Sequence, residues 1–447
     1  MFDTIVPLTI MIFILTVILI IWKPFGLNET IPTTIGAFLL ITFGAVSIRD
    51  LSDILSIVSG PSFTILSTIV MTIVLESVGF FRWVAANIIF YASGSGKKLF
   101  LYVILLCYFT TLFFNNDGSV LITTPIIINI VNQLKLKPHQ KIPYLLSGAL
   151  VATASSAPIA VSNIANLIAL NMVGLNLNTY VQLLFIPSMF GITVMVGFLY
   201  FYFRHELPVS IIKPTHRNFL IGGKRHPLES IEKPTIDWKL FNSAIAVVIL
   251  TRCSYFLLSP YGIPPEFIGI SGAVILLLLR WVRTRHGFLD VIKRTPWHIL
   301  LFAFSMYVIV FSLNKIGLTS FIVQYTKPIV SDSIFNAIFF VGTLLSVLSN
   351  LVNNLPSVMI GTMALINMDL SLDTLQISYL ASIIGSDIGS LLTPIGTLAT
   401  LLWMFILKKN QIPFTWGQYF KITFMVIPIT TVVTLMSFYL WTVWLFS

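Results

Sequence analysis

The sequence is poor in charged residues. Asp, Glu, Lys and Arg together occupy 9% of its 447 positions, whereas 57% are hydrophobic. A water-soluble domain of this length does not cover its surface with so few charges. Apolar runs of about 20 residues, enough to cross a hydrocarbon core of roughly 30 Å, fill most of the chain. The composition excludes a soluble globular protein and predicts an all-α integral membrane protein.

Residues that build disulfides and metal centres are also rare. The two cysteines, Cys107 and Cys253, lie far apart and give no disulfide pattern. The six histidines fall in loops or at the ends of apolar runs, and no His-Glu-x-x-His sequence occurs. We therefore expect no metal site and no cofactor, and we expect the chain not to be an enzyme.

Basic residues outnumber acidic residues, with 26 Lys and Arg against 16 Asp and Glu. They lie in short loops between apolar runs and form no single basic face, which argues against a nucleic-acid partner. In membrane proteins, loops rich in Lys and Arg face the cytoplasm. The basic loops therefore serve to orient the chain in the bilayer.

A short polar sequence motif occurs twice. Asn115-Asn116-Asp117-Gly118-Ser119 recurs as Asn353-Asn354-Leu355-Pro356-Ser357, at an offset of 238 residues. Each copy is followed by a Pro-bearing break inside an apolar run, Ala157-Pro158-Ile159 and Thr393-Pro394-Ile395, at an offset of 236 residues. Breaks at matching places of two hydrophobic halves are typical of transporters that bind their solute near the bilayer midplane. The sequence therefore predicts a solute transporter.

The two membrane repeats are predicted to be residues 1–203 and 240–447, joined by a basic linker at 204–239. Each repeat is expected to hold one re-entrant hairpin and one broken helix. These elements lie near 98–132 and 143–173 in the first repeat, and near 333–367 and 375–407 in the second. The predicted spans are Ile5–Ile21, Ile31–Ile48, Ser62–Phe80, Pro143–Val173, Tyr180–Phe203, Phe241–Leu258, Glu266–Leu279, Pro296–Leu313, Leu375–Leu407 and Gln418–Leu445.

Loop charges predict that the two repeats have opposite orientations. Five lysines flank the first hairpin, so both of its ends are expected to face the cytoplasm; they are Lys97, Lys98, Lys135, Lys137 and Lys141. The linker holds seven Lys or Arg and is placed on the same side. The ends of the second hairpin, near Asp332 and Asp369, are then external. We expect about ten transmembrane helices in an inverted repeat, with both termini outside.

Irregular backbone at membrane depth is tolerated only where it is buried in protein or lines a cavity. Two hairpin tips and two helix breaks would together supply one central pocket with exposed backbone amides and carboxamides. A single Asn or Ser also commonly serves only to join helices, but four breaks in repeat-related places favour a binding site. The predicted solute-contacting residues are Asn115, Asn116, Ser119, Ser155, Ser156, Asn163, Asn353, Asn354, Thr393, Gly396 and Thr397.

Two acidic residues are predicted within the membrane, Asp117 and Asp387. A carboxylate near the bilayer centre is costly and is usually kept for ion or proton traffic. We assign proton coupling to both, although Asp387 sits beside glycines and is equally well explained as a turn residue. Glu76 is expected to pair with nearby Arg82, and Arg252 is expected to extend its guanidinium toward the external surface.

Five segments carry a resemblance to a known family. They are Phe114 to Pro125, Val161-Ser162-Asn163, Thr295-Pro296-Trp297-His298, Asn353-Asn354-Leu355-Pro356 and the run Thr393 to Trp403. These segments resemble the ArsB arsenite efflux family of the ion transporter superfamily. The resemblance implies a bacterial cytoplasmic membrane protein that exports arsenite and antimonite in exchange for protons, with a cytoplasmic ATPase subunit as partner in some systems.

Within this interpretation, the solute is arsenite as the neutral trihydroxide, held by hydrogen bonds. A site of three thiolates is impossible in one chain because only two cysteines exist. The alternative is a sodium–proton antiporter of the same superfamily, in which Asp117 and hairpin carbonyls would bind sodium. A more distant alternative is an intramembrane aspartyl protease, in which Asp117 and Asp387 would share one proton.

Overall fold

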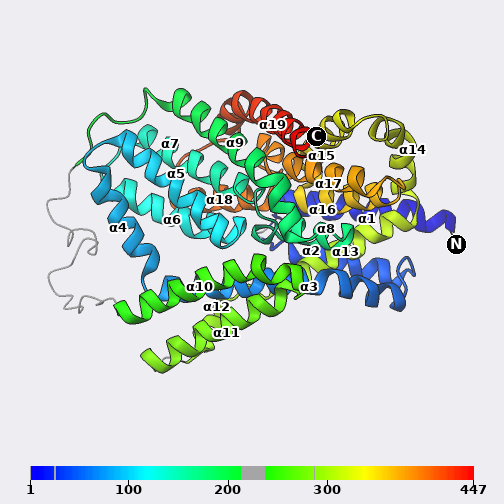
Figure 1. The fold of residues 1–447 in the computed structure, drawn as a ribbon, viewed down its shortest axis with the longest axis horizontal. Helices are drawn as coiled ribbons and strands as arrows, with labels where there is room; N and C mark the ends of the chain where they lie inside the picture. Colours follow the sequence, from blue (N-terminus) through cyan, green and yellow to red (C-terminus); the bar gives the residue numbers. More distant parts are fainter. Residues whose placement is uncertain (1, 25–26, 213–236, 286, 447) are drawn as a thin grey trace.

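The computed structural model describes the chain except for residues 1, 25–26, 213–236, 286 and 447. The described residues form 19 α-helices and short 3-10 turns, with no strand among them. Figure 1 shows α9 and α19 along one edge of the bundle, and α10 and α11 along the opposite edge. The helices of the first half are α1 (Phe2–Trp22), α2 (Thr30–Thr42), α3 (Ile48–Ser77), α4 (Phe80–Ala92), α5 (Gly96–Phe113), α6 (Asn116–Gln133), α7 (Pro138–Ala154), α8 (Ile164–Val173) and α9 (Leu177–Phe203).

The second half repeats this order of elements. A short helix, α12, precedes the long α13, and together these two occupy the place that α3 has in the first half. The helices of the second half are α10 (Trp238–Leu258), α11 (Pro265–Thr284), α12 (Leu289–Arg294), α13 (His298–Lys315), α14 (Leu318–Val330), α15 (Ile334–Val352), α16 (Asn354–Ile366), α17 (Leu372–Asp387), α18 (Leu398–Lys409) and α19 (Trp416–Phe446).

Ten helical segments of the described chain are long and apolar enough to cross a membrane, which confirms the predicted all-α membrane fold. The membership of this set differs from the expectation. α5 and α15 qualify although they were predicted as hairpin arms, whereas α2 is only 13 residues long and does not. The first broken helix divides into α7 and α8, and neither piece reaches spanning length by itself.

α3 begins 14 residues before the predicted start at Ser62. Its N-terminus is closed by a capping box, in which Ser47 and Asp50 exchange hydrogen bonds, and Lys315 pairs with the Asp50 carboxylate. A capping box satisfies two backbone donors of the first turn. The helix therefore extends through a charged first turn that the apolar pattern left out.

Glycines with positive φ precede the short helices α4 and α14. Gly79 has φ +90° and Gly317 has φ +92°, which other residues adopt only with strain. Both glycines follow a long helix, α3 or α13, and turn the chain into a 13-residue helix. The same backbone device thus occurs at the same place in each half.

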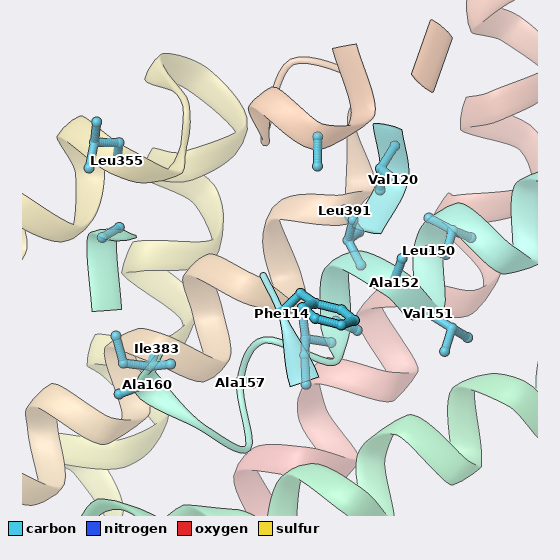
Figure 2. Close-up of a cluster of buried hydrophobic side chains, with 14 of the residues drawn as sticks. Phe114, Val120, Leu150, Val151, Ala152, Ala157, Ala160, Leu355, Ile383 and Leu391 are labelled. Atoms are coloured by element: carbon cyan, nitrogen blue, oxygen red, sulfur yellow. The ribbon is translucent and has the colours of Figure 1, made fainter. Parts of the chain in front are cut away.

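Each hairpin packs against the broken helix of both halves. α6, the second arm of hairpin 1 (α5 and α6), contacts α7 in its own half and α18 in the other. α16, the second arm of hairpin 2 (α15 and α16), contacts α17 in its own half and α8 in the other. Figure 2 shows a cluster of buried apolar side chains in this interior, which includes Phe114 and Ala157 from the first half and Leu391 from the second. The four breaks therefore lie in one shared interior.

Most of the predicted linker at 204–239 lies outside the described residues, because 213–236 are not described. On its N-terminal side the backbone N–H of Ile211 donates to the Gly94 carbonyl, which fixes the chain after α9 against the start of hairpin 1. The orientation of the termini stays a prediction.

Close packing of α15 on α17 generates a prediction about stability. A Cβ at Gly385 would lie 2.1 Å from the Gly342 carbonyl oxygen, so Gly385→Ala forces two backbones apart. We expect it to lower the free energy of unfolding by at least about 2 kcal/mol. Gly197→Ala in α9, where nothing lies within 4 Å, should stabilise by up to about 1 kcal/mol. Thermal unfolding in detergent measures both, and equal melting temperatures would contradict the predicted packing.

Candidate functional site

The first helix break is closed by polar side chains. α7 ends at Ala154, and the chain passes through Ser155 and Ser156 to a 3-10 turn at Ala160–Ser162. Asn163 then caps α8, because its Oδ1 accepts from the Ala165 backbone N–H at 3.0 Å. The Tyr180 hydroxyl donates to the Ala157 carbonyl at 2.7 Å. These bonds satisfy backbone groups that the interruption of the helix leaves free.

Asp387 lies at the last turn of α17 and is 1% exposed. Its carboxylate accepts three hydrogen bonds from the first break. Ser156 Oγ donates at 2.7 Å, Asn163 Nδ2 at 2.9 Å and Asn166 Nδ2 at 2.7 Å. A carboxylate with three donors is well satisfied even when it is buried. Asp387 therefore joins the broken helix of the second half to that of the first.

Asn166 belongs to this network and was missed in the sequence. It lies within the apolar run of α8, where a single Asn has no local signal that separates a ligand from a residue joining two helices. Its backbone carbonyl also accepts from the Tyr379 hydroxyl at 2.8 Å, so it is held on both sides by α17. Asn163 and Asn166 are three residues apart, which places their two carboxamides on one helical face. This separation was the clue in the sequence that Asn166 belongs with Asn163.

The second break is tied to the tip of hairpin 2. Asn350 Nδ2 donates to the Gly389 carbonyl at 2.8 Å, and its Oδ1 accepts from the Thr393 backbone N–H at 2.8 Å. Asn353, with φ +80°, donates from Nδ2 to the Ile395 carbonyl at 3.0 Å. Hairpin 2 and the second break therefore form one hydrogen-bonded unit.

The remaining predicted residues of the second half surround this unit. Thr397 caps α18 by accepting from the Thr400 backbone N–H at 3.1 Å. A Cβ at Gly396 would lie 1.9 Å from the Ser390 carbonyl oxygen, so the position has room only for glycine. Asn354 is 6% exposed at the start of α16.

The tip of hairpin 1 has fewer partners. Asn115 is extended at φ −157°, and its buried Oδ1 has no hydrogen-bond partner. Ser119 Oγ is also buried and unpaired, whereas Asn116 Oδ1 accepts from the Asp117 backbone N–H at 2.8 Å. The Asp117 carboxylate is half-buried, and the described structure gives it no hydrogen bond or ion pair. Unpaired buried oxygens also occur at Ser162 and Ser390 beside the two breaks, but among the described residues only this tip combines them with an acid that has no hydrogen-bond partner.

A cleft of about 610 Å³ reaches this tip. Its inner wall includes Asn115 and Gly118, and its outer part is formed by α3 and the junction of α12 with α13. An ion pair between Glu76 and Arg294 lies at the outer part, with both side chains nearly half exposed. The expected pairing of Glu76 with Arg82 is therefore wrong, because the basic partner comes from the other half of the chain.

Arg252 is buried, contrary to the expectation that it reaches the surface. Its side chain on α10 donates from Nε to the Phe113 carbonyl at 2.5 Å and from Nη2 to the Phe114 carbonyl at 2.6 Å. Both acceptors stand directly before Asn115. The guanidinium therefore turns inward to the end of α5, where carbonyl groups lack partners within the helix.

The two intramembrane acids have different surroundings. Both carboxylate oxygens of Asp387 accept hydrogen bonds from the first broken helix, and no hydrogen bond joins Asp387 to Asp117 in the described part of the chain. A protease dyad needs two carboxylates that share a proton. The observed arrangement instead gives Asp387 three hydrogen bonds to the first half and gives the Asp117 carboxylate none in the described structure.

Comparison with known proteins identifies the family. The model of the ArsB family, described as arsenical pump membrane protein, matches residues 8–442. The chain belongs to the ArsB family. A putative arsenical pump membrane protein of Bacillus subtilis (strain 168) is 48% identical over 97% of this chain and 99% of its own length. An arsenical pump membrane protein of Escherichia coli is 31% identical over 92% of this chain and 93% of its own length.

The fold also has a solved counterpart. The YdaH transporter of Alcanivorax borkumensis superimposes with a TM-score of 0.52 at 12% identity, covering 90% of each chain. Identity this low supports a common fold and nothing more specific. Membership of the ArsB family makes the chain a multi-pass membrane transporter rather than an enzyme, and favours an arsenical pump over the sodium–proton antiporter.

The network around Asp387 generates a prediction that separates the two acids. Asp387→Asn places an amide group against three donors, so at least one buried donor loses its acceptor at a cost of about 2–3 kcal/mol. Asp117→Asn removes no hydrogen bond and should leave stability unchanged. Thermal unfolding of the two variants in detergent compares them. A larger loss for Asp117→Asn would contradict the assignment.

Proposed function

We propose that the chain exports arsenite and antimonite from the cytoplasm, as neutral trihydroxides, in exchange for entering protons. The support for the solute class is the ArsB family match across residues 8–442. The support for the site is the tip of hairpin 1, where Asn115 Oδ1 and Ser119 Oγ are buried without partners and where Asn115 lines the cleft described above. Buried polar atoms are normally satisfied, so unmet ones favour a ligand.

The chemistry of this tip suits a small neutral solute that carries hydroxyl groups. Such a solute donates and accepts hydrogen bonds and needs no counter-charge. Carboxamides and hydroxyls offer both functions, and they release a neutral molecule more readily than thiolates release a thiophilic one. Cys107 is buried on α5 whereas Cys253 is exposed on α10, so the two thiols stand in different environments.

Asp117 is the proton carrier in this proposal. Its carboxylate has no partner to displace when it gains or loses a proton. Protonation of Asp387 would displace at least one of its three donors and disturb both breaks. We therefore retain Asp117 for coupling and assign Asp387 to holding the two halves in register.

Alternating access would follow from movement of hairpins and breaks against the surrounding helices. The inverted orientation of the halves, the external termini and the bacterial cytoplasmic membrane belong to this proposal, as does an ATPase subunit on the cytoplasmic linker. Inversion is supported by the repeated order of elements and by the crossed packing of α6 on α18 and α16 on α8.

The coupling role is tested by Asp117→Asn. We expect this variant to abolish proton-driven arsenite uptake into everted membrane vesicles, because the tip then has no group that binds a transferable proton. Asp369→Asn is the matched control, since Asp369 is an exposed acid with φ +49° that Asn also tolerates. Uptake by Asp117→Asn at the control rate with the same pH dependence would refute the role. Sodium-dependent proton exchange whose rate does not change when arsenite is added would favour the sodium–proton antiporter.

The cleft is tested by narrowing it. Leu121 lines the cleft and is 46% exposed, so Leu121→Trp fills space without overpacking a core. We expect severalfold slower arsenite transport at unchanged protein abundance. Leu278→Trp on α11 is the control, because Leu278 is 45% exposed and lies away from the cleft. Equal rates for the two variants in vesicles would exclude this cleft as the route to hairpin 1.

A further inference from the structure

Arg252 is a buried cation whose hydrogen bonds go to the hairpin 1 tip alone. The side chain is 6% exposed, and its two donated bonds both end on the last carbonyls before Asn115. No ion pair is formed by Arg252 in the described structure. Its Nη1 is buried without a partner, and the Tyr255 ring lies 5.5 Å from the guanidinium carbon. A buried charge without a carboxylate is costly, so its retention needs a reason.

The end of α5 supplies that reason. The final carbonyls of a helix lack partners within it and carry the negative end of the helix dipole. Phe114 leaves the helix with φ −126° and ψ −104°, and Asn115 follows in an extended conformation. Two donors from one planar guanidinium fix the carbonyls of Phe113 and Phe114 together. This contact therefore lies at the place where α5 ends and the tip begins.

The two hairpins differ in how they are held. Hairpin 2 is bonded to its own half through Asn350 and Asn353, which reach the second break. Within the described chain, residues 113–119 of hairpin 1 make no side-chain hydrogen bond to another helix except through Arg252. Arg252 comes from α10, the first helix of the opposite half. One side chain thus carries the polar connection of this tip.

We propose that Arg252 is a positioning residue that anchors the tip of hairpin 1 to α10 and thereby aims Asn115 and Asp117 at the solute. The anchoring stands on the geometry alone. Its consequence for transport rests on the function proposed above. Arg252 acts through the backbone of Phe113 and Phe114 and does not itself contact the solute.

Thiol labelling tests the anchoring without any transport measurement. Ser119 and Ser357 occupy matching places in hairpins 1 and 2, and both are 0% exposed. Each is changed to Cys, one at a time, in a full-length background carrying Cys107→Ala and Cys253→Ala. A membrane-impermeant methanethiosulfonate reagent then reports whether either tip opens to water.

We expect Arg252→Gln to speed labelling at position 119 and to leave position 357 protected. Arg280→Gln is the matched control, because Arg280 is 7% exposed but pairs with Asp290 in the segment between α11 and α13. It should leave both positions protected. Arg252→Lys keeps the charge and can reach one carbonyl, so it should give intermediate labelling at 119. This variant replaces Arg252→Gln in the test if the Gln variant does not fold.

Three results would overturn the anchoring. Equal acceleration of labelling at positions 119 and 357 by Arg252→Gln would mean that the whole protein has loosened. Unchanged labelling at 119 would mean that packing alone holds the tip. Faster labelling at 119 in Arg280→Gln would mean that the loss of any buried arginine opens the tip. Arsenite uptake in vesicles is measured in parallel, with a loss of transport expected for Arg252→Gln. Selective labelling with no arsenite transport by the unmodified protein would preserve the anchoring and reject the proposed function.

Discussion

The structure depends on one buried carboxylate that joins its two halves. Asp387 ends a helix of the second half and accepts hydrogen bonds from Ser156, Asn163 and Asn166 of the first. In hydrocarbon, a broken helix persists only if its freed polar groups find partners inside the protein. Each break finds partners for its backbone in its own half, through Tyr180 in the first and through Asn350 and Asn353 in the second. The Asp387 carboxylate adds the hydrogen bonds that join the two broken helices across the halves.

The four interruptions of the helices differ in how their side chains are hydrogen-bonded to other helices. The second hairpin and both breaks are linked by hydrogen bonds through Asn350, Asn353 and Asp387. The first hairpin tip keeps an acid without a hydrogen bond and an unpaired carboxamide oxygen, and among the described residues Arg252 alone joins this tip to another helix by side-chain hydrogen bonds. A site that binds weakly and releases its solute needs such unmet groups on an otherwise rigid frame. The repeated sequence therefore gives one hairpin that is hydrogen-bonded to its break and one, hairpin 1, to which we assign solute and proton binding in the proposed function.

The sequence could predict the elements that leave a local mark, namely the apolar spans, the two Asn-Asn phrases, the Pro-bearing breaks and the number of spanning helices. It could not predict contacts between distant residues. Glu76 pairs with Arg294, 218 positions away, rather than with Arg82 in its own vicinity. Asn166 binds a carboxylate 221 positions away and Arg252 binds a carbonyl 139 positions away, so the sequence alone identifies neither partner. Charged residues at the start of α3 likewise concealed its true beginning.

The central claim is that this chain alone couples arsenical movement to a proton gradient through the hairpin 1 tip. Purified protein in liposomes, without nucleotide and with an imposed pH difference, tests it most directly when arsenite and protons are followed together. The account predicts arsenite accumulation on the acidic side, accompanied by proton movement in the opposite direction that collapses with the gradient. Accumulation that needs ATP, or that proceeds at the same rate without a pH difference, would contradict it.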